Sequence, residues 1–358
     1  MRGWSKKSQR GTPAVPDRVF AVNEKDAATV AVSGSEGQIT RRDGLKLVAA
    51  GIAAALLPHT SRTATLGESL ESTHPESKRE PMSSYIKVGQ ENSTPVELYY
   101  EDHGSGSPVV LIHGWPLSGA SWEKQTAALL AAGHRVITYD RRGFGRSSRP
   151  AVGYNYDTFA ADLDAVLNTL KLTDVSLVGF SMGTGEVTRY IGKFGTKRVR
   201  KAVLIGTLGP YLVKAADNPE GVDRSVFEGL KAAIKADRPA TLMEFLRNFY
   251  NYDVTGGKLV SERVLEDNWN VAAGASAIGT LTCVDSWIED FRQDITRNTV
   301  PTLILHGDAD RILPPDASSR RQAKMIKNVS FVELPGGPHG VLWTHAQQIN
   351  SELVKFLA

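Results

Sequence analysis

The chain has 358 residues, 41% of them hydrophobic, which predicts a globular protein with a substantial core. Forty-two Lys and Arg stand against 39 Asp and Glu, a formal net charge of +3 with no dense basic stripe in the folded part, which argues against a nucleic-acid-binding protein. The single cysteine, Cys283, cannot form an internal disulfide, and we interpret it as a small buried hydrophobe.

Residues 1–82 form a leader rich in Ser, Thr, Glu and Lys with little apolar periodicity, which predicts disorder. Within it, residues 40–58 hold the pair Arg41-Arg42, an apolar run and Pro58, and resemble a twin-arginine export signal. The run is too short for a stable membrane span, which needs about 20 apolar residues. We expect export to the periplasm or the exterior; the alternative is a cytoplasmic enzyme with a disordered leader.

Residues 83–358 alternate short β-rich runs with helical patterns, which predicts an α/β domain with a mostly parallel sheet flanked by helices. Tyr85–Val88 and Val96–Glu101 are expected to open the domain as a hairpin. The predicted parallel strands are Val109–His113, Arg135–Tyr139, Val175–Gly179, Val203–Gly206, Thr302–His306 and Ser330–Leu334. The predicted helices are Trp122–Ala132, Phe159–Leu170 and Thr184–Phe194.

The alternation breaks at about residues 209–298, where helical stretches such as Ser225–Ala236 and Thr241–Phe249 follow one another without a strand signal. An insertion of helices after a central strand would lie over the carboxyl ends of the sheet. We therefore predict a helical lid above the active site.

The most informative motif is Gly179-Phe180-Ser181-Met182-Gly183, a serine between two glycines, after a β-branched run and before a helical stretch. A serine on a tight strand-to-helix turn has strained backbone angles, and glycines two positions away remove side-chain collisions there. The pattern predicts a nucleophile elbow with Ser181 as the nucleophile.

A serine nucleophile needs a general base and an acid that orients the base, in the chain order Ser, Asp or Glu, His on this fold. His339 lies in a glycine-rich loop after the last predicted strand and is the expected base, whereas His306 and His345 are interpreted as structural. The loop after the preceding strand offers Asp308 and Asp310. We select Asp310 as the acid, and expect Asp308 to stabilise the loop.

Two backbone N–H groups are expected to stabilise the oxyanion of a tetrahedral intermediate. Met182 follows the nucleophile, and Trp115 lies in the loop after an early strand, where Pro116 restricts it to an extended conformation. The side chains of Trp115, Phe180 and Met182 either line an apolar pocket for a small acyl group or belong to the core. The loop Tyr139–Ser148 is interpreted as architectural, because it has no phosphate-binding fingerprint.

Together these motifs resemble the α/β-hydrolase superfamily, and within it the branch of cofactor-free haloperoxidases, perhydrolases and related arylesterases. The resemblance runs from about Tyr85 to the C-terminus. It is carried by residues His113–Gly119, Tyr139–Ser148, Gly179–Val187 and Pro338–His345. It implies a catalytic triad of Ser181, Asp310 and His339, and oxyanion amides from Trp115 and Met182.

The resemblance further implies that a short carboxylic acid or ester acylates the serine and that water or hydrogen peroxide releases the acyl group, without metal, haem or other cofactor. Pro116 would then matter, because a carbonyl held toward the serine can accept a hydrogen bond from peroxide. Three alternatives stay open: a plain carboxylesterase, a lactonase, and a hydrolase-fold sensor of small molecules. The sequence leaves a homo-oligomer possible and specifies no physiological substrate.

Overall fold

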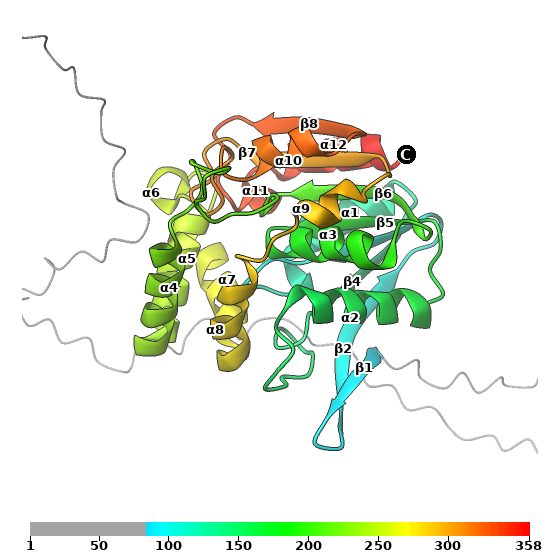
Figure 1. The fold of residues 1–358 in the computed structure, drawn as a ribbon, viewed down its shortest axis with the longest axis horizontal. Helices are drawn as coiled ribbons and strands as arrows, with labels where there is room; N and C mark the ends of the chain where they lie inside the picture. The colour runs from blue at the N-terminus through cyan, green and yellow to red at the C-terminus, as the bar shows by residue number, and fades with distance from the viewer. Residues whose placement is uncertain (1–83) are drawn as a thin grey trace, which may run out of the picture. The chain divides into compact units, whose positions relative to one another are not determined.

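The computed structural model describes residues 84–358, so the predicted leader and its export signal lie outside the described part of the chain. Eight strands form one sheet in the order β1-β2-β4-β3-β5-β6-β7-β8 (Figure 1). From β4 to β8 every neighbouring pair is parallel, while β1 and β2 pair antiparallel with each other and β2 pairs antiparallel with β4. The predicted α/β class with its opening hairpin is confirmed.

The strand bounds follow the prediction closely. They are β1 Tyr85–Glu91, β2 Thr94–His103, β3 Pro108–Ile112, β4 Arg135–Tyr139, β5 Val175–Phe180, β6 Val199–Ile205, β7 Thr302–Gly307 and β8 Val329–Leu334. The largest difference is in β6, which begins four residues before the predicted Val203. The start of β6 carries Arg200 and Lys201 at half-buried positions. This part of the strand is therefore amphipathic and lacks the apolar run that is typical of a fully buried strand.

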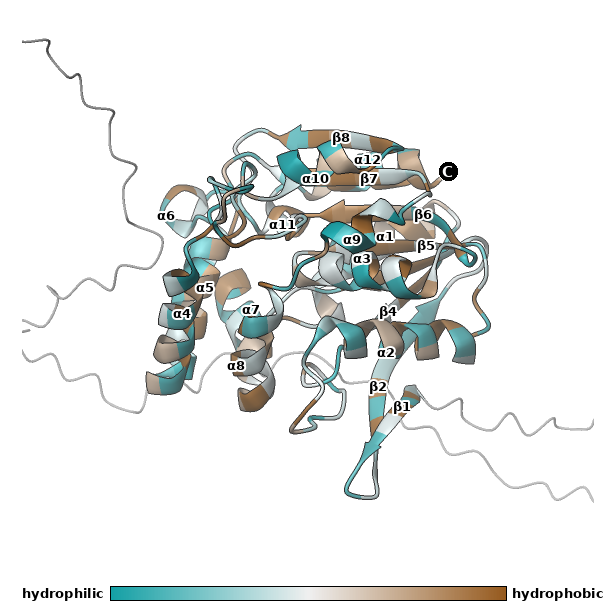
Figure 2. Ribbon diagram, in the orientation of Figure 1, coloured by the Kyte–Doolittle hydropathy of each residue, from teal (hydrophilic) through white to brown (hydrophobic). Residues whose placement is uncertain are grey.

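Helices cover both faces of the sheet. On one face, α1 (Glu123–Ala131) packs against α12 (Ala346–Leu357) and the short α11 (Val341–Thr344). On the other, α3 (Met182–Phe194) packs between α2 (Tyr156–Thr169) and α9 (Arg292–Thr296), and α10 (Ser319–Met325) lies against β7 and β8. Figure 2 shows the apolar strands β5 and β6 between these layers. Apart from Arg200 and Lys201, their side chains are buried on both sides, as a parallel sheet covered by helices requires.

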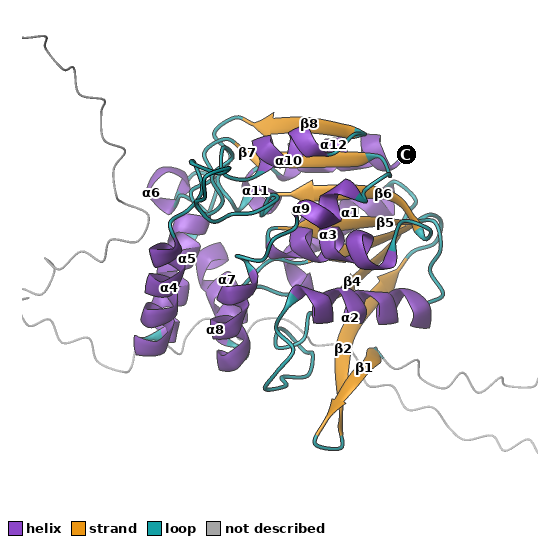
Figure 3. Ribbon diagram, viewed as in Figure 1, coloured by secondary structure: helices purple, strands orange, loops and turns teal. Residues whose placement is uncertain are grey.

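The segment between β6 and β7 holds a group of helices that stands apart from the sheet layers (Figure 3). These are α4 Arg224–Ala236, α5 Arg238–Phe249, α6 Tyr252–Thr255, α7 Glu262–Ala273 and α8 Ala277–Ser286. Side chains of Asp223, Asp237, Ser261 and Ser276 accept backbone hydrogen bonds at four helix starts. We call α4 to α8 the lid. Among residues 84–358, each helix is too short or too polar to cross a bilayer.

A buried charge network links the nucleophile helix to the loop after β3. Arg141 donates from Nε to Glu186 on α3 and from Nη2 to the carbonyl oxygen of His113, both at 2.8 Å. The Arg141 amide donates to His113 Nε2 at 2.9 Å, and the Tyr139 hydroxyl donates to Glu186. Burial raises the pKa of Glu186, and the charge of Arg141 opposes that shift. The loop after β4 is therefore architectural, as predicted.

Replacing Glu186 with Gln leaves the Arg141 guanidinium buried without its counter-charge. We expect the free energy of unfolding, measured by urea denaturation, to fall by about 3 kcal/mol or more. The matched control is Glu266→Gln, because Glu266 pairs with Arg263 on the surface, where the two side chains are 50% and 88% exposed. Equal stability of the two variants would show that the buried pair does not hold α3 in place.

Candidate active site

Ser181 occupies the turn between β5 and α3, with φ 52° and ψ −121°, a backbone conformation that is unfavourable for a residue with a side chain. The two flanking glycines allow this turn. A Cβ on Gly179 would lie 2.5 Å from the carbonyl oxygen of Gly183, and a Cβ on Gly183 would lie 2.2 Å from that of Ile112. The collisions that the glycines avoid are therefore with the backbone of the turn and of β3, and the turn packs directly against that strand.

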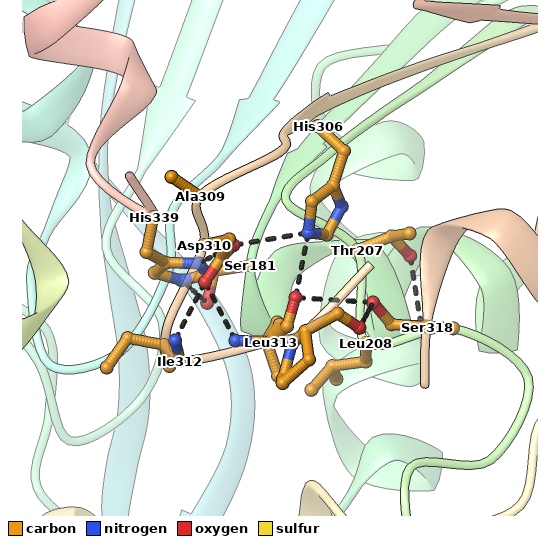
Figure 4. A network of polar contacts seen from close by, with 12 residues as sticks. Ser181, Thr207, Leu208, His306, Ala309, Asp310, Ile312, Leu313, Ser318 and His339 are labelled. Carbon is orange, nitrogen blue, oxygen red and sulfur yellow. Dashed lines mark hydrogen bonds and ion pairs between the residues drawn. The ribbon is translucent and has the colours of Figure 1, made fainter. Parts of the chain in front are cut away.

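The structure brings Ser181, His339 and Asp310 into one hydrogen-bonded chain (Figure 4). His339 Nε2 lies 2.8 Å from Ser181 Oγ, and His339 Nδ1 lies 2.7 Å from Asp310 Oδ2. All three residues are buried. A carboxylate accepts hydrogen bonds, so the proton of the neutral imidazole lies on Nδ1 and Nε2 is free to accept the Ser181 hydroxyl proton.

Asp310 is held as a carboxylate by its own loop. Its Oδ1 accepts the backbone N–H groups of Ile312 and Leu313, each at 2.8 Å. Burial alone would raise the pKa of Asp310, but the charge of His339 and the hydrogen bonds that reach the carboxylate outweigh burial and hold this pKa well below its ordinary value. Asp308 Oδ1 instead accepts the amide of Gly336 at 2.6 Å and braces the loop toward His339, the role expected for it.

Two amides lie beside the nucleophile. Met182 is the first residue of α3, so its N–H is one of the helix-start donors without an intrahelical acceptor. The loop that holds Trp115 approaches Ser181 closely, because a Cβ on Gly114 would lie 2.9 Å from Ser181 Cβ. Among residues 84–358, the Trp115 amide donates no backbone hydrogen bond, while the next N–H along the chain, that of Leu117, donates to Gly114. Neither predicted donor is thus tied to a backbone acceptor in the described part of the chain, which is what an oxyanion donor requires.

Aromatic side chains of the lid pack on the Trp115 ring. The ring centroid of Phe245 in α5 lies 4.7 Å from that of Trp115, and the centroid of Trp287, at the end of α8, lies 5.0 Å from it. Both rings pack edge to face on Trp115. Trp115 is 1% exposed. The lid therefore covers the loop that carries the predicted oxyanion amide.

The two predicted pocket residues differ in their surroundings. The ring centroids of Phe180 and His339 are 5.2 Å apart. Phe180 also lines a cavity of about 70 Å³ between the lid and the core. Pro116 is buried, follows Trp115 through a cis peptide bond, and does not line this cavity. The other residues that line the cavity include Leu117, Phe249, Val271 and Leu342.

The junction between α5 and α6 touches the loops that hold the acid and the base. The Phe249 ring lies edge to face 5.0 Å from His339, and its carbonyl oxygen accepts the Gly340 amide at 2.8 Å. Asn251 donates from Nδ2 to the carbonyl oxygen of Ala309 at 2.8 Å. Neither lid residue is identified by the motifs of the sequence. The i, i+4 spacing of Phe245 and Phe249 indicates an apolar helix face, but nothing local indicates what that face covers.

The geometry suits acid and base chemistry at Ser181, since a buried, oriented imidazole can remove the hydroxyl proton while a buried carboxylate stabilises the imidazolium. Cys283 has a different character, because burial raises the pKa of its thiol to about 12. It is a buried free thiol, as predicted. Residues 84–358 contain no group of three or more His, Cys, Asp and Glu side chains arranged to hold a metal ion.

Known proteins of the same architecture are similar to this chain in sequence. A family model described as the alpha/beta hydrolase fold matches residues 107–346. A protein of Synechocystis sp. named "Putative non-heme chloroperoxidase" is 59% identical over 273 residues, 76% of this chain and 99% of that protein. The "Bifunctional esterase/perhydrolase DCH" of Acinetobacter calcoaceticus is 35% identical over 266 residues, 73% of this chain and 96% of that protein.

Among solved structures, a bromoperoxidase from Bacillus anthracis superposes with a TM-score of 0.74 at 50% sequence identity. The match covers 76% of this chain and 98% of that one. The resemblance that the motifs indicated is thus confirmed over the whole part of the chain that carries them. The protein is an enzyme of the α/β-hydrolase family, to which the non-haem chloroperoxidases and bromoperoxidases among its relatives also belong.

Proposed function

We propose that the protein is a serine hydrolase that cleaves short-chain esters through an acyl-serine intermediate and can pass the acyl group to hydrogen peroxide. The observation that carries the proposal is the hydrogen-bonded chain from Ser181 Oγ through His339 to Asp310, with distances of 2.8 and 2.7 Å. Ser181, His339 and Asp310 serve as nucleophile, base and acid, and the amides of Trp115 and Met182 serve as oxyanion donors.

In the first half of the reaction, Ser181 Oγ attacks the ester carbonyl carbon while His339 Nε2 takes the hydroxyl proton. The oxyanion that forms accepts hydrogen bonds from the two backbone amides. The C–O bond to the alcohol breaks, the alcohol takes the proton from His339, and an acyl-serine remains. The Asp310 carboxylate stabilises the imidazolium during both proton transfers without itself becoming protonated.

In the second half, His339 removes a proton from water or hydrogen peroxide, whose oxygen attacks the acyl carbon. Collapse of the intermediate returns the proton to Ser181 and releases a carboxylic acid or a peracid. The peroxide branch is supported by the similarity to the Acinetobacter calcoaceticus protein whose name includes perhydrolase. A small nucleophile suits the site, because Ser181 is only 7% exposed and the rings of Phe180 and Phe249 pack against its partner His339.

Replacing Ser181 with Ala removes the nucleophile and should lower kcat for p-nitrophenyl acetate by up to about a millionfold, and abolish peracid formation from acetate and peroxide. Ser351→Ala on the exposed side of α12 is the matched control. Peracid formation that survives in Ser181→Ala would place the peroxide chemistry elsewhere. An active ester reaction without peracid in the parent protein would reduce the function to a plain esterase, and inactivity toward both would favour a sensor.

Replacing Asp310 with Asn should lower kcat about 10⁴-fold, because an amide can donate to Nδ1 and then stabilises the wrong tautomer of His339. The matched control is Asp308→Asn in the same loop, where the amide oxygen still accepts from Gly336. We expect less than about a tenfold loss there. Steady-state kinetics on the same ester distinguish the two aspartates, and equal losses would remove Asp310 from its assigned role.

Replacing Pro116 with Leu frees the φ angle at position 116 and the conformation of Trp115 before it. If the Trp115 carbonyl is held toward the serine to accept a hydrogen bond from peroxide, the ratio of perhydrolysis to hydrolysis falls several-fold in this variant. Peracid and acid yields from one reaction mixture measure the ratio. An unchanged ratio would mean that Pro116 has no part in selecting the nucleophile.

A further inference from the structure

His306 is a second histidine beside the carboxylate of Asp310. It lies at the end of β7 and is fully buried. Its Nε2 lies 3.2 Å from Asp310 Oδ2 and 2.9 Å from the carbonyl oxygen of Leu313 (Figure 4). Asp310 Oδ2 is also the oxygen that His339 contacts. One carboxylate oxygen therefore lies between two imidazole rings.

The surroundings of His306 determine where its proton lies. The Leu313 carbonyl and the Asp310 carboxylate can only accept hydrogen bonds, so Nε2 carries the proton. Nδ1 is buried and has no hydrogen-bond partner among residues 84–358. A second proton there would be a buried donor without an acceptor, which is costly. The arrangement thus favours a neutral His306 that donates from Nε2 alone.

We propose that His306 is a positioning residue that shares its Nε2 proton between Asp310 and Leu313, and so fixes the orientation and the charge of the carboxylate that His339 uses. Oδ1 of Asp310 is already held by the amides of Ile312 and Leu313. In the described part of the chain, the contacts of Oδ2 are with the two imidazoles. The inference rests on the proposed function, because it assigns His306 a role through Asp310 and His339.

The same contact closes the acid loop. Asp310 accepts the Leu313 amide, and the Leu313 carbonyl accepts from His306, which is four residues before Asp310 at the strand end. The loop from β7 is thereby tied back to its own strand. Glu333, the residue opposite His306 in the β7–β8 register, is bound by Arg320 at 2.7 Å. Among residues 84–358, Asp310 is therefore the charged group that the Nε2–H of His306 contacts.

The test compares His306→Phe with His306→Gln. Phe fills the ring volume without a donor, whereas the amide nitrogen of Gln can occupy the place of Nε2. We expect His306→Phe to lower kcat for the ester about 10- to 100-fold with little change in KM, the size of effect expected for a lost hydrogen bond to a charged group. His306→Gln should recover most of this loss. His103→Phe is the control, because His103 is exposed at the end of β2 and the same exchange of rings there leaves the site untouched.

The pH profile separates positioning from a merely structural effect. Without the His306 donor, more of the Asp310 charge acts on His339 and favours its protonated form. The acid limb of kcat/KM should therefore move to higher pH in His306→Phe and return in His306→Gln. A variant that is merely less well folded loses amplitude without moving this limb. An unmoved limb together with parental kcat in His306→Phe would overturn the proposal.

A readout without turnover keeps the proposal testable if the parent protein cleaves no ester. The proton between His339 Nδ1 and Asp310 gives a downfield ¹H NMR signal, whose position should change in His306→Phe and return in His306→Gln. That result with an inactive parent would support the role of His306 while contradicting the proposed function. If His306→Phe does not fold, His306→Asn replaces it, since its shorter amide cannot reach Asp310. An unchanged signal in the folded variant would refute the contact.

Discussion

Ser181 keeps a backbone conformation that costs about 1–3 kcal/mol, and the surrounding structure has to hold it there. The constraint is the close approach of the elbow to β3, where the hypothetical Cβ of Gly183 would lie 2.2 Å from the Ile112 carbonyl oxygen. Such an approach requires β5 and β3 to be neighbours in the sheet, in register and parallel. The same approach brings the loop after β3 against Ser181, so that Ser181 and the loop of Trp115 are held together by two strands that are neighbours in the sheet.

Histidines illustrate how the surroundings decide a residue's chemistry. His113 accepts from the Arg141 amide at one ring nitrogen and contacts the Gly114 carbonyl at the other, and burial beside Arg141 lowers its pKa well below the ordinary value. It is locked in one neutral tautomer and acts as a structural bridge. His339 has a carboxylate at Nδ1 and a hydroxyl at Nε2. That pair of neighbours permits proton transfer, because one stabilises the charged ring and the other supplies the proton.

Much of the site could be predicted because its signals are local. The elbow is a five-residue pattern, and the loops after β7 and β8 follow apolar runs that are typical of strands buried on both faces. The contacts of Phe249 and Asn251 could not be predicted, since they depend on how the inserted helices dock on loops 58 and 91 residues away. His306 was interpreted as structural because a histidine at the end of a buried strand looks the same whether it fills space or donates to a carboxylate. Its role depends on the path that the next seven residues take.

The position of the lid within the chain affects how the protein is made. Ser181 precedes His339 by 158 residues, and the whole lid is synthesised between the strands that pair as β6 and β7. At about 5–20 residues per second, a ribosome needs roughly 8–30 s to go from the serine to the histidine. During that interval the nascent chain has Ser181 without His339, and until β7 is made β6 can pair on one side only, with β5. The growing chain therefore lacks the Ser181–His339 hydrogen bond until its last loop is made, and it exposes an open sheet edge until β7 and β8 are added.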